Sequence, residues 1–259
     1  MVNRGTKEGT IEEINFVKKL NKKDDLKLWD TLNLSSDNHF AVHIKHNKLS
    51  KINQKKVKPK ADIFISEGYV DDIELKKKEY YLSEDDLNDF NLKPVSYTGI
   101  SVKLKTSKNY QIIKMTPNTF EEIFQDRELG AGISLFSQKE KDLKENINVL
   151  NGWNVKLTDF KQYFSKVIDF EIDENMLTLE EASIIKQYSI KNVTKQIKES
   201  PDIKKFIFQG IGNFEEPFTV HYLYENDVLR NNCEVPFSIT TGSGRHKGTY
   251  TVVLKPKKY

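Results

Sequence analysis

Two short strand-like segments of this chain carry side chains that could bind a metal ion and act on a phosphodiester. Asp62 lies in the otherwise apolar segment 60–65. In residues 99–105 apolar and polar side chains alternate, so Ser101 and Lys103 share one face of the expected strand. A carboxylate, a second oxygen and a lysine at the edge of one sheet are the components of a Mg²⁺ site that activates water. The pattern therefore predicts hydrolysis of a phosphodiester.

Each of these residues has a simpler interpretation. An acid in an apolar strand costs free energy unless it is paired or binds a metal, although Asp62 could be an exposed residue at a strand end. A rival acid-x-Lys pattern occurs at Glu74 and Lys76. Charged residues surround that pair, so a strand there would lack an apolar face. We prefer Ser101 and Lys103 and keep Glu74 and Lys76 as the alternative.

The two segments resemble the signature of the PD-(D/E)xK nuclease superfamily, and within it the type II restriction endonucleases. That signature is an Asp on one strand followed by an acid-x-Lys on the next strand of the same small sheet. Here Asp62 and Lys103 match it, Ser101 stands where the second acid is usual, and the proline is displaced to Pro59. Some restriction enzymes carry Gln or Asn at the position of Ser101.

The resemblance continues on both sides of the signature. Glu8 resembles the acid that such enzymes often supply from their first helix, and Glu12 lies one helical turn later. The run 102–112 resembles the segment that follows the catalytic lysine in small four-base cutters, and Gln111 within it would contact the scissile phosphate. The resemblance thus implies catalytic roles for five residues and metal binding by three of them. The catalytic set is Asp62, Ser101, Lys103, Glu8 and Gln111, and the metal ligands are Asp62, Ser101 and Glu8.

The resemblance implies a Mg²⁺-dependent, sequence-specific endonuclease that cuts double-stranded DNA and leaves a 5′-phosphate and a 3′-hydroxyl. Palindromic sites usually require two-fold symmetry, so we expect a homodimer. A cognate DNA methyltransferase is expected genetically. Two alternatives stay open: a structure-specific or repair nuclease of the same superfamily, and a non-catalytic nucleic-acid-binding protein.

Basic residues gather in two segments that could contact DNA phosphates, although the net charge is only +3. Residues 48–60 hold six lysines and no acid, and residues 241–248 place Arg, His and Lys among three glycines. A solvated loop and a plain hairpin turn are the simpler interpretations of these segments. An Arg can read guanine, which favours DNA contact. The predicted DNA-binding residues are Lys56, Lys58, Lys105, Ser243, Arg245, His246 and Lys247.

Composition narrows the class of protein. The chain has 259 residues, 37% of them hydrophobic, which is enough for one large core or two small ones. No apolar run could span a bilayer and no secretory signal is visible, so we expect no membrane partner. Cys233 is the only cysteine, which suits a reducing cytoplasm. The histidines at positions 39, 43 and 46 lack the pattern of a zinc site and are predicted to lie on the surface.

The order of elements predicts a single α/β domain over residues 1–259, with a mixed central sheet flanked by helices as in restriction endonucleases. The catalytic core would span about 1–130, a helical insertion about 138–200 and a C-terminal β region about 204–259. Capping boxes at Thr10–Glu13 and Thr178–Glu181 would open helices, and Pro117 would begin another. Strands are expected at 40–44, 60–65, 99–105, 206–208, 218–224, 235–240 and 250–254.

Overall fold

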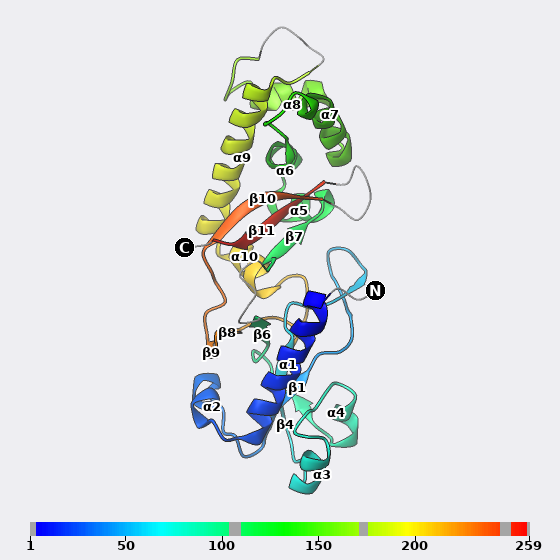
Figure 1. Cartoon of the computed structure of the whole chain (residues 1–259), viewed down its shortest axis with the longest axis vertical. Coiled ribbons are helices and arrows are strands. Elements are labelled where there is room, and N and C mark those ends of the chain that lie inside the picture. The colour runs from blue at the N-terminus through cyan, green and yellow to red at the C-terminus, as the bar shows by residue number, and fades with distance from the viewer. Residues whose placement is uncertain (1–3, 104–109, 171–175, 244–249, 258–259) are drawn as a thin grey trace. The chain divides into compact units, whose positions relative to one another are not determined.

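The computed structural model describes residues 4–103, 110–170, 176–243 and 250–257, and of residues 4–8, 141 and 243 the backbone only (Figure 1). The chain divides into two compact units, and each unit is assembled from two separate stretches of sequence. Unit 1 comprises Met1–Lys108 and Lys205–Glu234. Unit 2 comprises Asn109–Lys204 and Val235–Tyr259.

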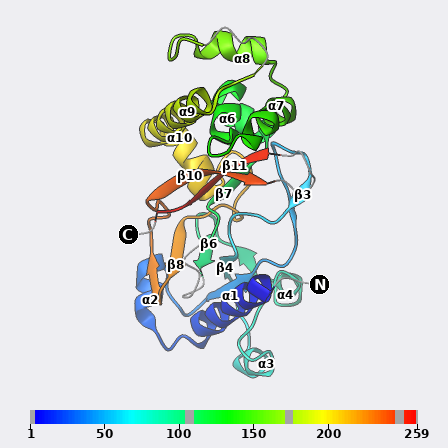
Figure 2. The same ribbon diagram turned by 45° about the horizontal axis from the view of Figure 1, so that its top comes forward.

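Unit 1 is built on a six-stranded mixed sheet, with the strand order β1-β4-β6-β8-β9 and with β5 paired to β4. The central strand β6 is antiparallel to β4 on one side and parallel to β8 on the other. Figure 2 shows β4, β6 and β8 side by side. The sheet strands are β1 (His39–His43), β4 (Ile63–Glu67), β5 (Lys93–Pro94), β6 (Ile100–Lys103), β8 (Tyr222–Glu225) and β9 (Val228–Arg230). The remaining elements are α1 (Arg4–Lys22), α2 (Leu26–Leu32), α3 (Asp72–Lys77), α4 (Asp86–Asp89), the two-stranded ribbon of β2 (Lys48–Leu49) and β3 (Lys56–Val57), and a π-helix, η1 (Lys205–Gln209).

Two apolar clusters form the core of unit 1. In the first, α1 and α2 pack against Ile63, Ile100 and Val102, and Phe16 stacks on Tyr224 with ring centroids 3.6 Å apart. The second cluster gathers alternate residues of β1 and β4 with the loops around α3. The alternation of β6 thus buries Ile100 and Val102 as predicted.

Unit 2 packs helices around a three-stranded antiparallel sheet of order β10-β11-β7. Its centre is α6, where Gly130 lets Trp153 approach so closely that a Cβ there would lie 2.1 Å from the indole ring. Trp153 Nε1 donates to Ser134 Oγ at 3.0 Å. The elements are β7 (Ile113–Met115), α5 (Pro117–Phe124), α6 (Arg127–Ser134), α7 (Lys141–Trp153), α8 (Leu157–Phe164), α9 (Leu179–Glu199), α10 (Pro201–Lys204), β10 (Phe237–Ser243) and β11 (Tyr250–Pro256).

The predicted fold class is confirmed: the chain is α/β, with a mixed central sheet flanked by helices. The helices of 138–200 and the strands near 237–256 lie where expected. The predicted strand at 206–208 is wrong, because these residues belong to η1. A short apolar run does not distinguish a strand from a buried helix. Strand β8 begins only at Tyr222, so residues 218–221 precede it.

The two expected capping boxes had different outcomes. Thr178 accepts a hydrogen bond from the Glu181 N–H, and the Glu181 side chain bonds back, so this box opens α9 as predicted. The box at Thr10 is wrong, because α1 begins at Arg4 and Thr10 lies inside it. Over the described residues, no helix has the length and apolar character needed to cross a membrane.

Candidate active site

Asp62 lies directly before β4, between the end of β1 and the beginning of β6. Its backbone N–H donates to Ile100 O at 2.9 Å, and its carbonyl accepts from the Ile44 N–H at 2.9 Å. These bonds fix the residue between two neighbouring strands. Its carboxylate Oδ2 accepts from the Val102 N–H at 2.9 Å, so the side chain is directed toward β6.

A chain of hydrogen bonds links Asp62 to the two predicted residues of β6. Lys103 Nζ donates to Ser101 Oγ at 2.6 Å, and Ser101 Oγ donates to Asp62 Oδ2 at 3.2 Å. Ser101 is buried. The structure therefore brings Asp62, Ser101 and Lys103 together on adjacent strands of one sheet, as the sequence predicts. Their catalytic role stays a prediction.

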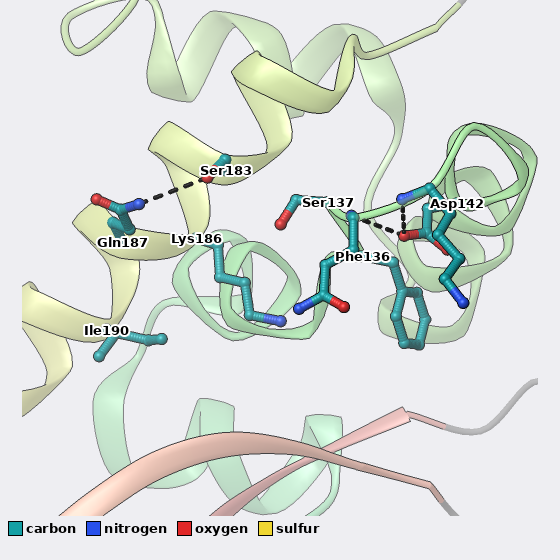
Figure 3. Close-up of a pocket in the computed structure, with 9 residues that line it drawn as sticks. Phe136, Ser137, Asp142, Ser183, Lys186, Gln187 and Ile190 are labelled. Atoms are coloured by element: carbon teal, nitrogen blue, oxygen red, sulfur yellow. Dashed lines mark hydrogen bonds between the residues drawn. The ribbon is translucent and has the colours of Figure 1, made fainter.

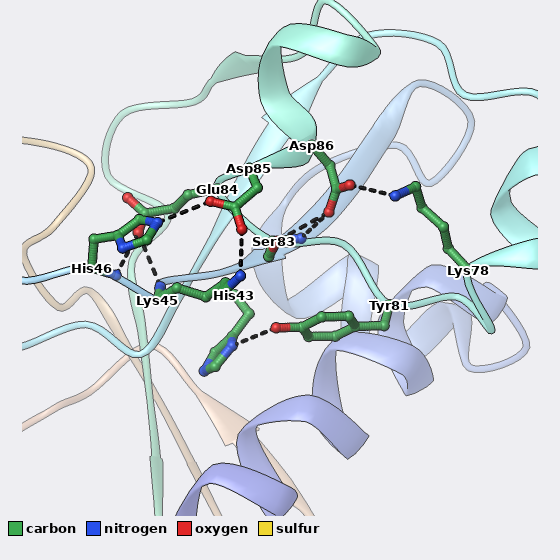
Figure 4. A network of polar contacts seen from close by, with 9 residues as sticks. All are labelled: His43, Lys45, His46, Lys78, Tyr81, Ser83, Glu84, Asp85 and Asp86. Atoms are coloured by element: carbon green, nitrogen blue, oxygen red, sulfur yellow. Dashed lines mark hydrogen bonds and ion pairs between the residues drawn. The ribbon is translucent and has the colours of Figure 1, made fainter.

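A second carboxylate, Glu13 of α1, belongs to the same site. Glu13 Oε2 lies 2.9 Å from His43 Nε2 and 3.2 Å from Lys58 Nζ. Because a carboxylate only accepts, His43 Nε2 donates to it, and His43 Nδ1 lies 2.9 Å from the Tyr81 hydroxyl (Figure 4). Burial raises the pKa of Tyr81 to about 12, so its phenol remains a donor. The predicted surface position of His43 is wrong, since its side chain is buried between these two partners.

Burial and the charges of Glu13, Lys103 and Lys58 all act on Asp62. Burial raises the pKa of Asp62, and the nearby charge of Glu13 raises it further, although Lys103 and Lys58 oppose the shift. Burial also opposes the ionisation of Glu13, but the hydrogen bonds from His43 and Lys58 outweigh it and lower its pKa. Two carboxylates close enough to repel each other are stabilised by a divalent cation.

The residues present fit Mg²⁺, which prefers oxygen ligands and usually keeps several waters. Asp62 accepts the hydrogen bonds of Ser101 and Val102 at one oxygen, Oδ2. Glu13 supplies the second carboxylate. No cluster of three or more His, Cys, Asp or Glu side chains suited to a metal occurs among the described residues. A Mg²⁺ ion held by these two carboxylates would take its further ligands from water or a phosphate.

A second lysine adjoins the site. Burial lowers the pKa of Lys60 to about 7, and the positive charge of Lys103 contributes to the shift. Gly210 permits this placement, since a Cβ there would lie 2.9 Å from Lys60 Cβ. Burial also raises the pKa of the neighbouring Cys233 to about 12, so the only cysteine of the chain stays a protonated, unreactive thiol.

Two acids, Glu84 and Asp85, pair with basic residues in and just before the basic segment predicted to contact DNA. Lys48 pairs with Glu84, and Lys45 and His46 pair with Asp85. Lys58 contacts Glu13, which ties it to the candidate site, and Lys56 is an exposed residue of β3. The side chain of Lys56 therefore lies in solvent. The side chain of Lys58 is partly exposed and contacts Glu13 of the candidate site.

The described structure leaves the remaining predicted residues untested. Gln111 is exposed and belongs to unit 2. Glu8 lies in α1 and Ser243 in β10, but their side chains are outside the described part. Lys105 and the segment of Arg245, His246 and Lys247 also lie outside the described residues. Their predicted roles stay predictions.

The rival pair belongs to a helix rather than a strand. Glu74 and Lys76 lie in α3, where Lys76 pairs with Asp72 at 2.5 Å and Glu74 pairs with Lys77 at 2.6 Å. These are exposed ion pairs between neighbours on one helix. The strand that this alternative required is therefore absent at residues 72–77.

Glu13 is the residue that sequence reasoning missed. A helix beginning at Thr10 would have used Glu13 in its capping box. In the longer helix, Glu13 shares one stripe with Phe16, Val17 and Leu20, all of which are buried, whereas Ile11 is 56% exposed. An acid at a core position of an amphipathic helix was the available signal.

Neither a scan against models of protein families nor a search of curated proteins finds a match for this chain.

Proposed function

We propose that this chain is a Mg²⁺-dependent endonuclease that hydrolyses double-stranded DNA at a specific sequence, a type II restriction enzyme. The observation that carries the proposal is the hydrogen-bonded chain from Lys103 through Ser101 to Asp62 across two adjacent strands. Glu13 adds a carboxylate from the first helix, the element from which the resembling enzymes often supply an acid. The resemblance to the PD-(D/E)xK nucleases rests on these residues.

Each residue has a role that follows from its position. Asp62 and Glu13 would hold Mg²⁺, with the Val102 carbonyl or Ser101 as a further oxygen ligand. When bound, Mg²⁺ supplies Lewis-acid stabilisation and a more acidic water. Lys103 would orient the attacking water as an ammonium, or accept its proton as a neutral amine, and the ammonium would stabilise the negative charge that develops on the attacked phosphate. Ser101 positions Lys103 relative to Asp62 through its two hydrogen bonds.

The proposed partners follow from the reaction. Duplex DNA would be held by Lys56 and Lys58, by Lys105, and by the segment from Ser243 to Lys247. A second copy of the chain would supply the two-fold symmetry of a palindromic site. A DNA methyltransferase would protect the host sequence, and we place the enzyme in the cytoplasm.

The proposal is tested by incubating the protein with phage DNA and Mg²⁺. Discrete bands support a restriction enzyme, cleavage of branched substrates alone supports a structure-specific or repair nuclease, and no cleavage supports a non-catalytic DNA-binding protein. Asp62→Asn should reduce cleavage to background and keep DNA binding in a gel-shift assay. Asp72→Asn, which alters an exposed acid of α3, is the matched control and should cleave normally.

The choice of lysine is tested in the same assay. Lys103→Ala should lose cleavage, because it removes the cation held by Ser101. Lys76→Ala should keep most of it, because Lys76 is an exposed partner of Asp72. The reverse pattern would move the site to Glu74 and Lys76, and full activity of both variants would overturn the assignment to either pair.

A further inference from the structure

Unit 2 contains a cavity of about 610 Å³ between α9 and the loop that joins α6 to α7 (Figure 3). Ser183, Lys186, Gln187 and Ile190 line it from α9. Phe136 lines it from the loop. Its volume is within the range of about 300–1,000 Å³ that is typical of small-molecule sites. None of the residues of the candidate nuclease site borders it.

Lys186 is a half-buried cation without a carboxylate partner. Its Nζ donates to Leu135 O at 2.7 Å and to Thr241 Oγ1 at 3.2 Å, which are both neutral acceptors. Within the described ranges no acid forms an ion pair with it; burial lowers its pKa, and the charge of Asp142, which also lines the cavity, opposes that shift. An ammonium group has three protons to donate, so an anion in the cavity would take the third.

The other polar groups of the cavity include a second lysine, Lys139, and hydroxyl and amide groups that can both donate and accept. Gln187 Nε2 donates to Ser183 Oγ at 3.4 Å, so the Ser183 hydroxyl proton can be directed elsewhere. Ser137 contributes a second hydroxyl from the loop. The carboxylate of Asp142 already accepts the backbone N–H groups of Gln138 and Lys139 at 2.8 and 2.9 Å. Asp142 therefore fixes the loop, and the hydroxyls and the ammonium retain protons that could be donated to a ligand.

The number and directions of these donors indicate the chemistry of the ligand. Hydroxyls on two sides of the cavity and an ammonium suit an anion with three oxygens better than a planar carboxylate with two. A phosphate group alone would leave most of the volume empty. The ring of Phe136 and the side chain of Ile190 give that volume an apolar wall.

We propose that this cavity binds a phosphate monoester that carries an aromatic or apolar body. Lys186 holds the phosphate, the hydroxyls of Ser137 and Ser183 orient it, and Phe136 and Ile190 contact the body. The ligand is either a free metabolite or the 5′-phosphorylated end of a nucleic acid strand, because both present the same chemistry.

Isothermal titration calorimetry of the whole protein with phenyl phosphate tests the proposal. Phenyl phosphate should bind more tightly than inorganic phosphate, which lacks the ring, and more tightly than benzoate, which lacks the third oxygen. Lys186→Gln should weaken binding about tenfold or more, because it removes a charge-assisted hydrogen bond. Lys191→Gln, at an exposed position of the same helix, is the matched control and should bind as the native chain does.

Ser183→Ala provides an independent variant, because it removes one hydroxyl from a half-exposed helix position and leaves Lys186 with its partners in place. It should weaken binding of phenyl phosphate several-fold. Absence of saturable binding by the native protein at millimolar phenyl phosphate would overturn the proposal. Native affinity in both Lys186→Gln and Ser183→Ala would also overturn it.

A competition experiment distinguishes a free metabolite from the 5′-phosphorylated end of a strand. Displacement of phenyl phosphate by a 5′-phosphorylated dinucleotide at lower concentration supports a strand end, and weaker competition supports a free metabolite. Asp62→Asn should bind phenyl phosphate as the native chain does. The outcome at this cavity is thus separate from the outcome of the cleavage assay.

Discussion

Glu13 is a carboxylate on the core-facing side of a helix, and its partners explain how it is tolerated there. A buried acid costs free energy unless it is paired and hydrogen-bonded. His43 and Lys58 both reach the same oxygen, Oε2, and Tyr81 holds His43 from its other side. These partners therefore hold the carboxylate in one position.

Glu13→Gln should reduce cleavage about tenfold or more and raise the Mg²⁺ concentration needed for half-maximal activity. The amide keeps the size of the side chain but removes the charge that would bind the cation. Cleavage rates measured across a Mg²⁺ series test this. Glu12→Gln changes the neighbouring acid and should leave both quantities unchanged. An unaltered Mg²⁺ dependence in Glu13→Gln would show that Glu13 has only a structural role.

At the scale of single residues, the sequence predicts the strand-borne part of the site and misses the helix-borne part. Alternation in β6 is a local property, so the common face of Ser101 and Lys103 follows from their spacing. Glu13 depends on the rotation of α1 about its axis, which is set by where the helix begins and by what it packs against. Neither the start of α1 nor its packing can be deduced from the four residues that resemble a capping box.

Strand β6, which carries Ser101 and Lys103, pairs closely with β8. Gly99 precedes β6, and its carbonyl accepts from the N–H groups of His221 and Tyr222 at 2.8 and 3.1 Å. A Cβ at Gly99 would lie 1.8 Å from Thr219 O. This contact is with the backbone, so it cannot be relieved by rotating a side chain.

Gly99→Ala should lower the free energy of unfolding by about 2 kcal/mol or more, because overpacking against backbone forces the two strands apart. Gly9→Ala is the matched control, since a Cβ there meets nothing within 4 Å. Gly9 lies inside α1, so alanine should stabilise the protein by about 0.5–1 kcal/mol. Urea unfolding monitored by circular dichroism measures both. Equal stability of the two variants would contradict the close approach of β6 and β8.

At the scale of elements, local capping and long-range packing explain what could be predicted. The box at Thr178 opens α9 because nothing before it continues the helix. At Thr10 the preceding residues extend α1, and the same four-residue pattern lies inside it. Residues 206–208 follow directly on α10, and their apolar side chains bury as η1 without the alternation that a strand needs.

For the whole molecule, Lys60 makes stability depend on pH in the alkaline range. Its folded pKa of about 7 is below the ordinary lysine value of 10.5. Between these values the unfolded chain binds a proton that the folded chain does not. The contribution of Lys60 to stability therefore rises as the pH increases through this window, and the penalty of burying the charge is fully present below about pH 7.

Lys60→Met should remove this dependence. The difference in unfolding free energy between Lys60→Met and the native chain should favour the variant near pH 7 and shrink toward about pH 9.5. Urea unfolding at both pH values measures it. Lys55→Met replaces an exposed lysine and should show the same difference at both pH values. A pH-independent difference for Lys60→Met would mean that Lys60 is charged in the folded protein.

The order of the strands of unit 1 along the sequence also determines when the candidate site can form during synthesis. Strand β8 pairs with β6, and Tyr222 follows Lys103 by 119 positions. At roughly 5–20 residues per second, a ribosome needs about 6–24 seconds to make that intervening stretch. Throughout that time Ser101 and Lys103 belong to an unpaired edge strand of a nascent chain. The protein is therefore made with one edge of its candidate site unpaired until β8 has been synthesised.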